Sequence, residues 1–370
     1  MGVPLAWHNL WHEKSKLALH VLGIAATLAL IALLVGLRAG MYATLTAYVD
    51  NAGADLIVSQ LGVEGLFSSN SAIPAALHDD LAASEDVLEV GHVLVADIIF
   101  THGKTKTPVL LVGYNPETGI GGPWHIGAGR AVQNDNEITL DMWLAWRSDI
   151  AIGDEVAILG QPFTVVGLTR ETASWMSPYL FISQQAAEEV MQLPGTASFY
   201  LLRVTDGADL TATAASIETR FDGVSVLTPE SMAAADRKVL ATVLDAPINV
   251  MLFISAVIAV SVMGIITYSN ILSRIEEYSV LKAIGAGSGW LQGLVARETL
   301  YRTVFGFALG TGLSYLVADL IMRQWPQFTV IIQPETIAAV GVAALLMTLV
   351  AGLWPVRRII GLDPASVFKA

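Results

Sequence analysis

Four apolar runs constrain the fold of this 370-residue chain more than any other feature of its sequence. They extend over residues 17–37, 248–268, 304–322 and 336–356, and the second contains no charged side chain. About 20 apolar residues are enough for a helix to cross roughly 30 Å of hydrocarbon. The first run, with 21 residues, exceeds the roughly 7–15 apolar residues of a secretory signal, so we expect a retained helix. The sequence therefore predicts a polytopic membrane protein with four transmembrane helices.

The charged residues are distributed unevenly between the apolar runs. Residues 38–245 hold 26 of the 33 acidic and 10 of the 20 basic residues, a balance of −16, and the remainder balances at +3. This distribution predicts one large, acidic, water-exposed domain between the first and second spans. Its charge argues against nucleic acid as a partner, because nucleic-acid surfaces are matched by basic stripes. The chain has no cysteine, which excludes disulfides and thiolate metal sites.

Basic residues near the helix ends predict the orientation. They are Lys14 and Lys16 before the first span, Arg274, Lys282, Arg297 and Arg302 between the second and third, and Arg357, Arg358 and Lys369 after the fourth. All three sets lie on one side, which the positive-inside rule makes cytoplasmic. We expect both termini to be cytoplasmic and the large domain to be extracytoplasmic.

Local patterns in the large domain predict a mixed sheet with helices. Strands are expected at 54–58, 87–100, 107–114, 198–205 and 224–227, and helices at 73–84 and 210–220. Residues 115–195 contain short segments at 137–140, 155–159, 163–168 and 179–182, separated by Gly and Asp turns. This texture is typical of a small β-rich subdomain inserted into the first. The fold class is thus four transmembrane helices plus an α+β extracytoplasmic domain.

The predicted organisation follows the chain in order. It comprises an amphipathic cytoplasmic interface helix (1–16), the first span (17–46), half of the large domain (47–115), its inserted subdomain (116–195), the second half (196–229), a linking helix with the second span (230–272), a cytoplasmic region (273–298), the third span (299–323), a short external loop (324–335), the fourth span (336–357) and a cytoplasmic tail (358–370). In the interface helix, tryptophans at 7 and 11 anchor one face.

The sequence contains no recognisable catalytic constellation. GxSxG, HExxH and Walker A sequences are absent, and the histidines are scattered without ligand spacing. We therefore predict no catalytic, cofactor-binding or metal-ligating residue. Asp319 is the one carboxylate within a predicted span, near its outer end, where snorkelling to water is easy. Trp124, Trp143, Trp146 and Trp175 gather in the inserted segment, where they serve either as core or as contacts for a partner or an apolar substrate.

The charged stretch 269–301 separates the second and third spans. We expect residues 276–286 to continue the second helix into the cytoplasm, the glycines at 287 and 289 to turn it, and Ser288 to cap a short surface helix over 290–298. Glu298 and Arg302 stand at i, i+4 in the favourable order and are predicted to pair. In the third span Gly306, Gly310 and Ser314 form a small-residue ridge suited to helix packing, within the chain or between chains.

Two patches resemble the FtsX/MacB-type permeases of ABC transporters. The first is EEYSVLKAIGA at 276–286 with Glu298 downstream, and the second is WPVRR at 354–358 with LDPASV at 362–367. The order of one helix, a large external domain and three helices is also similar to this family, and the resemblance covers the whole chain. It implies porter and sabre subdomains like those of MacB. No ATPase is fused, so the chain looks closer to DevC-type or LolC/LolE-type subunits.

The resemblance implies a permease subunit of the bacterial plasma (inner) membrane that is not itself an enzyme. Two copies of a separate ABC ATPase would bind ATP and Mg²⁺, and this chain itself would need no cofactor. A second permease would complete a dimer, and a homodimer is favoured over a heterodimer. An adaptor protein is a further candidate partner. The residues expected to contact or support the ATPase are Glu276, Lys282, Ala283, Ile284, Gly285, Ala286, Trp290 and Glu298. The resemblance favours export by mechanotransmission, with lipoprotein release and regulation of wall hydrolases as alternative functions. A membrane-anchored sensor or scaffold that uses no ATP is a further alternative.

Overall fold

The computed structural model describes residues 14–67, 70–172, 177–325 and 328–360, the last nine by their backbone alone. The chain divides into two compact units. A helical unit contains residues 14–40, 246–325 and 330–360, and an α/β domain contains the described residues of 41–245 together with 328–329. Residues 1–13 of the predicted interface helix (1–16), Trp175 and the 362–367 patch lie outside the described residues, and residues 14–16 form the start of the first long helix.

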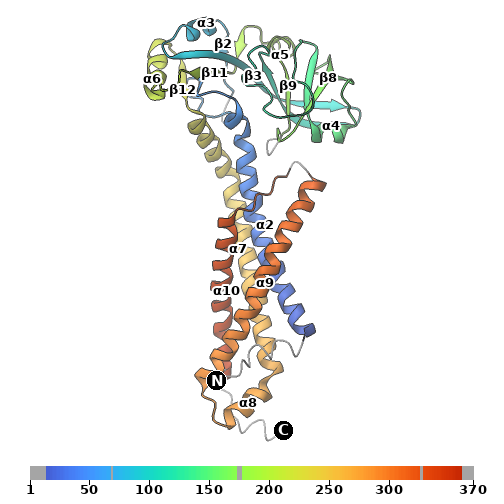
Figure 1. Cartoon of the computed structure of the whole chain (residues 1–370), viewed down its shortest axis with the longest axis vertical. Helices are drawn as coiled ribbons and strands as arrows, with labels where there is room; N and C mark the ends of the chain where they lie inside the picture. Colours follow the sequence, from blue (N-terminus) through green and yellow to red (C-terminus); the bar gives the residue numbers. More distant parts are fainter. Residues whose placement is uncertain (1–13, 68–69, 173–176, 326–327, 361–370) are drawn as a thin grey trace. The chain divides into compact units, whose positions relative to one another are not determined.

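Among the described residues, the helical unit has four long helices and one short helix (Figure 1). The long ones are α2 (Lys14–Asn51), α7 (Pro229–Ser273), α9 (Ser288–Gln324) and α10 (Pro334–Ile360), and the short one is α8 (Ile275–Ala283). All four long helices are apolar and long enough to cross a membrane. Helices α2 and α7 continue into the α/β domain, since its boundaries follow Gly40 in α2 and Asp245 in α7. Helix α7 continues through Pro247 without interruption.

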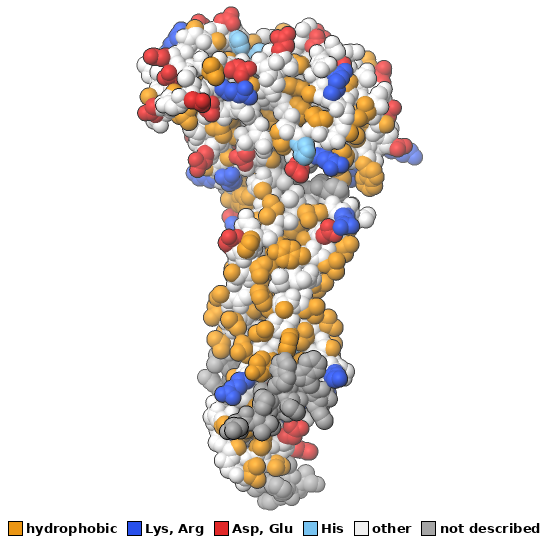
Figure 2. All heavy atoms as spheres, viewed as in Figure 1, with side chains coloured by type: hydrophobic (Ala, Val, Ile, Leu, Met, Phe, Trp, Pro, Cys, Tyr) orange, Lys and Arg blue, Asp and Glu red, His pale blue; other side chains and the backbone are white. Residues whose placement is uncertain are grey.

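The surface of the helical unit is apolar over most of its length, whereas charged side chains gather on the α/β domain (Figure 2). Phe253, Ile265 and Leu349 are each more than two-thirds exposed. Contiguous apolar surface of this kind is rare on soluble proteins and suits contact with lipid. The four predicted spans are therefore confirmed as apolar helices long enough to cross a membrane.

Small residues let α9 approach α2 closely. A Cβ added at Gly306 would lie 2.5 Å from Cγ2 of Ile24, and one at Gly310 would lie 2.8 Å from the carbonyl oxygen of Ala25. Ser314, the third member of the predicted ridge, is fully buried. The ridge thus packs within the chain, with α2 as its neighbour.

The α/β domain has one ten-stranded sheet among its described residues, in the order β12-β1-β11-β3-β4-β9-β6-β8-β5 with β7 beside β8. The strands are β1 (Leu56–Gln60), β3 (Val87–His102), β4 (Thr105–Tyr114), β5 (Ile126–Gly129), β6 (Glu137–Asp141), β7 (Glu155–Ile158), β8 (Gln161–Thr169), β9 (Tyr179–Ser183), β11 (Phe199–Val204) and β12 (Val224–Leu227). Strand β3 joins two regions, because its first half pairs with β11 and its second half with β4. Strand β4 then pairs in parallel with β9, so the sheet is continuous across residue 115.

Most predicted strands are confirmed, but the helix expected over 73–84 is shorter. Ile73–Pro74 form strand β2 with β10 (Thr196–Ala197), and α3 covers only Leu77–Ala82. A residue before proline is pushed away from helical geometry, and Ile73 is buried against Leu56 and Tyr200 in a hydrophobic cluster. Helix α6 (Leu210–Arg220) matches its predicted range.

The segment predicted to be β-rich also contains two helices, which the prediction missed. Helix α4 (Met142–Ser148) begins where the Asp141 carboxylate accepts a hydrogen bond from the Trp143 backbone N–H. Helix α5 (Gln184–Met191) begins where the Ser183 hydroxyl accepts from the Ala186 N–H. Each cap residue ends a buried strand, which explains the direct passage from strand to helix.

Candidate functional site

The connection between α7 and α9 is a helix, a turn and the start of another helix. Helix α7 ends at Ser273, and Arg274, with φ −122° and ψ 22°, leaves helical geometry before α8 begins. The prediction that 276–286 continues the second span is therefore wrong, because the break at Arg274 makes α8 a separate helix. The short surface helix predicted over 290–298 is also wrong, since these residues form the first turns of α9.

A glycine ends α8 by a Schellman motif. The Ala286 N–H donates to the carbonyl of Leu281 at 2.9 Å, and the Gly285 N–H donates to that of Lys282 at 3.1 Å. This pattern requires a left-handed residue at Gly285, whose φ is +104°. Leu281 and Ala286 pack against the same hydrophobic cluster, as the motif favours. The sequence KAIGA thus ends the helix at this position.

Helix α9 starts at Ser288 with Gly287 as its N-cap. The prediction of Ser288 as the cap is wrong by one residue, because Gly287 has the extended ψ of 146° that a cap needs. Leu291, Leu294 and Val295 then form the buried face of the first turns and pack against Tyr278 of α8. Burial, reinforced by the nearby Glu298 carboxylate, raises the pKa of the Tyr278 hydroxyl above its ordinary value.

A buried ionic cluster holds the two long helices together beside this connection. Glu298 is fully buried, with its carboxylate 3.8 Å from the guanidinium of Arg274 and 3.8 Å from that of Arg302. Asn270 bridges the same groups, because its amide N–H donates to Glu298 at 3.2 Å and its carbonyl accepts from Arg302 at 2.8 Å. We call these four residues the charge hub. It fixes the end of α7 to α9 at the point where α8 departs.

The predicted coupling residues fall into two groups. Glu276, Ala283, Ile284, Gly285 and Trp290 are exposed, and Lys282 and Ala286 are half-buried. Ile284 is 76% exposed and Trp290 is 49% exposed, although both are large and apolar. Glu298 differs, since it lies in the charge hub and its predicted pair with Arg302 is present. The turn therefore displays apolar side chains on a base that the charge hub secures.

Sequence reasoning missed two members of the charge hub, Asn270 and Arg274. Their spacing of four residues, with Asn270 in the last turn of α7 and Arg274 just after it, repeats the spacing of Glu298 and Arg302 on α9. Polar pairs at i, i+4 on both sides of one connection indicate that the two helices present polar side chains to each other there.

Two family models match consecutive parts of the chain. The MacB-like periplasmic core domain matches residues 17–220, which is more than half of the sequence, and the FtsX-like permease C-terminal model matches residues 249–364. The chain belongs to the FtsX/MacB family of ABC transporter permeases.

Relatives of this permease come from bacteria and archaea. An uncharacterized ABC transporter permease of Mycobacterium tuberculosis is 23% identical over 357 residues, which cover 96% of each chain. A second from the same species is 21% identical over 373 residues and 98% of each chain. One from Methanocaldococcus jannaschii is 24% identical over 239 residues, covering 60% of this chain and 58% of its own.

Two solved structures are similar to part of the permease. The periplasmic region of MacB from Actinobacillus actinomycetemcomitans covers 50% of this chain and 92% of its own, at 11% identity and a TM-score of 0.40. The extracellular domain of the noncanonic ABC-type transporter YknZ from Gram-positive bacteria covers 48% of this chain and 100% of its own, at 13% identity and a TM-score of 0.39.

Proposed function

We propose that this permease transmits the ATP-driven motion of a separate ATPase to its α/β domain, for export or extrusion of a substrate. The observation that carries the proposal is the α8–α9 turn. It exposes Ile284 and Trp290 beside a fully buried charge hub. Exposed large apolar side chains on a rigid base are suited to docking another protein, since hot spots are enriched in such anchors.

The helices that leave the charge hub support a mechanical role. Helix α7 has 45 residues, which at 1.5 Å per residue corresponds to about 68 Å of continuous helix, and it contributes to both units. A displacement of the α8–α9 turn would act on the end of α7 through Arg274 and Asn270. The α/β domain would then be moved by a helix rather than by a path for substrate through the spans.

The proposal includes an orientation and a set of partners. The basic residues beside the turn favour a cytoplasmic position for α8 and an extracytoplasmic position for the α/β domain. We propose a dimer of permeases, each with one ATPase subunit that binds ATP and Mg²⁺, in the bacterial plasma membrane. The division of the α/β domain into porter-like and sabre-like parts belongs to the same proposal.

The experiment compares two exposed apolar residues in different places. Ile284→Glu places a charge at the turn, and Ile99→Glu places one on β3 of the α/β domain, where Ile99 is 59% exposed. The tagged chain is purified in mild detergent with its co-expressed ATPase, and bound ATPase and ATP turnover are measured in nanodiscs. We expect Ile284→Glu to reduce both at least about tenfold, because a buried charge at an interface core is costly.

Ile99→Glu should leave both measurements unchanged. Retained ATPase association and turnover in Ile284→Glu would refute the assignment of the turn. Reproducible absence of any ATPase from the wild-type preparation would favour a sensor or scaffold instead.

A further inference from the structure

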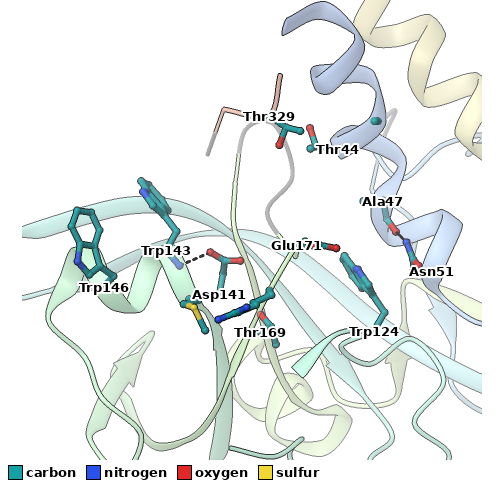
Figure 3. Close-up of a pocket in the computed structure, with 13 residues that line it drawn as sticks. Thr44, Ala47, Asn51, Trp124, Asp141, Trp143, Trp146, Thr169, Glu171 and Thr329 are labelled. Carbon is teal, nitrogen blue, oxygen red and sulfur yellow. Dashed lines mark hydrogen bonds between the residues drawn. The ribbon is translucent and has the colours of Figure 1, made fainter. Parts of the chain in front are cut away.

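A pocket in the α/β domain is lined by three tryptophans and lies apart from the α8–α9 turn. Its volume is about 760 Å³, and Trp143 and Trp146 of α4 lie across it from Trp124 and α2 (Figure 3). This volume falls within the range of about 300–1,000 Å³ that is usual for sites of small organic ligands. The lining is predominantly apolar, with Met142 and Ala47 beside the tryptophans.

Two of the tryptophans are held rigidly. The Trp124 ring makes edge contacts with Tyr48 and Tyr179, at centroid distances of 6.2 and 5.8 Å. The Trp143 ring packs against a buried cluster of the domain, and its backbone N–H donates to the Asp141 carboxylate at 2.9 Å. Pre-organised aromatic walls of this kind bind a ligand at a low cost in conformational entropy.

Core packing does not explain the third tryptophan. Trp146 is 72% exposed although it lies one helical turn from Trp143 on the same pocket wall. A large aromatic ring left in water at the edge of an apolar pocket gains free energy when an apolar ligand covers it.

The polar part of the lining offers a cation. Arg170 follows strand β8, its side chain is exposed, and its guanidinium makes no ion pair with any side chain in the described ranges. The neighbouring carboxylates are already engaged. Glu171 lies 3.8 Å from the His125 ring, and Asp141 accepts hydrogen bonds from Trp143 and the Thr172 hydroxyl. Arg170 is therefore the cation that the lining offers to an anionic group, beside two carboxylates that have partners of their own.

Chain connectivity places the pocket near the membrane. Ala43 lines it six residues after the end of the apolar run at Leu37, a distance of about 9 Å along α2. Thr329 lines it as well, from the short connection between Gln324 and Pro334, the ends of two spans. Both connections lie on the same side of the membrane, because two crossings, by α7 and α9, separate them.

We infer that this pocket binds an amphiphile from the adjacent leaflet, with an apolar chain between the tryptophans and an anionic headgroup at Arg170. Each part of the ligand matches one observation, namely the aromatic walls, the Arg170 guanidinium and the proximity to lipid. Tryptophan suits such a place because it is amphipathic and enriched at membrane interfaces. The inference stands apart from the ATPase proposal, since binding needs no nucleotide.

The test uses the full chain in phosphatidylcholine nanodiscs and a lysophosphatidic acid probe with a photoactivatable chain. Crosslinking to the α2 peptide around Ala47 is measured as the probe concentration rises, and again with a lysophosphatidylcholine probe that carries the same chain. The variants are Trp146→Ala, Arg170→Gln and, as a control for lost positive charge, Lys104→Gln on the exposed β3–β4 turn. ATPase association of each variant is recorded separately.

We expect saturable labelling whose half-saturation rises about tenfold in Trp146→Ala, for either probe. Arg170→Gln should raise it about fivefold for the anionic probe and leave the zwitterionic one unchanged. Lys104→Gln should behave as wild type. Labelling that grows in proportion to probe without saturating, or that is the same in Trp146→Ala as in wild type, overturns the site. Equal affinity for both probes in wild type and Arg170→Gln overturns the headgroup assignment.

Discussion

Glu298→Gln should destabilise the helical unit more than the loss of an exposed ion pair would. The substitution keeps the size of the side chain but leaves the guanidinium groups of Arg274 and Arg302, each about 95% buried, without their shared carboxylate. Removing one partner of a buried ion pair costs about 3–5 kcal/mol. Asn270 still accepts from Arg302, so we expect the lower end, about 3 kcal/mol.

Asp319→Asn is the matched control on the same helix. Asp319 pairs with Arg323 at i, i+4 and 2.8 Å, which is closer than either contact of Glu298. The Arg323 side chain is 76% exposed, so solvent screening limits the pair to at most about 1 kcal/mol. Burial rather than distance thus decides which pair matters.

The assay is thermal unfolding of the full chain in one detergent, followed by circular dichroism at a helical wavelength. For a unit of this size about 3 kcal/mol corresponds to a decrease of about 6–12 °C, against no more than about 4 °C for the control. Replacing Glu298, Arg274 and Arg302 together by apolar residues should recover much of the loss, because no buried charge is left unpaired. Equal midpoints for Glu298→Gln and Asp319→Asn would refute the assignment of the charge hub as a structural fastener.

Three further predictions concern stability. The Arg130 guanidinium lowers the pKa of Glu137 to about 2. In denaturant titrations at pH 7, the free energy of unfolding of the wild type should therefore exceed that of Glu137→Gln by about 2 kcal/mol, and this difference should disappear as the pH falls from 4.5 towards 2. Burial raises the pKa of Asp236 to about 6, so the native state binds more protons than the unfolded state between pH 4 and 6. The free energy of unfolding of the wild type should therefore fall by about 2 kcal/mol as the pH rises through this window. Asp236→Asn should remove this dependence on pH. Gly310→Ala should lower the unfolding temperature by several degrees, because its Cβ meets a backbone carbonyl of α2, whereas Gly312→Ala, with open space, should not; equal effects would contradict the packing of α9 on α2.

The parts of the fold that local patterns specify were predictable. Residues 210–220 and 224–227 match α6 and β12, because Asp209 caps the helix and alternating burial marks the strand. The membrane helices follow from length and hydropathy alone. The helix expected at Ile73 failed because tertiary pairing with β10 overrode its periodicity.

The candidate sites were predictable only in part. The exposed turn around Gly285 follows from its sequence, because KAIGA carries the signal for a helix end. The charge hub depends on Arg274 facing Glu298 across 24 residues, and the tryptophan pocket depends on Trp124 and α4 lining one cavity from separate parts of the sequence. No local pattern specifies such distant pairings.

Pro247 has a mechanical consequence for α7. Proline has no N–H, so the carbonyl of Val243 lacks its partner within the helix. Bending at this turn therefore breaks no hydrogen bond donated by residue 247, and sharp kinks in helices are found mainly at such positions. The compliant turn adjoins the boundary between the two units, which follows Asp245. If α7 transmits motion as proposed, a push at one end would become a rotation at the other, with the pivot at Pro247.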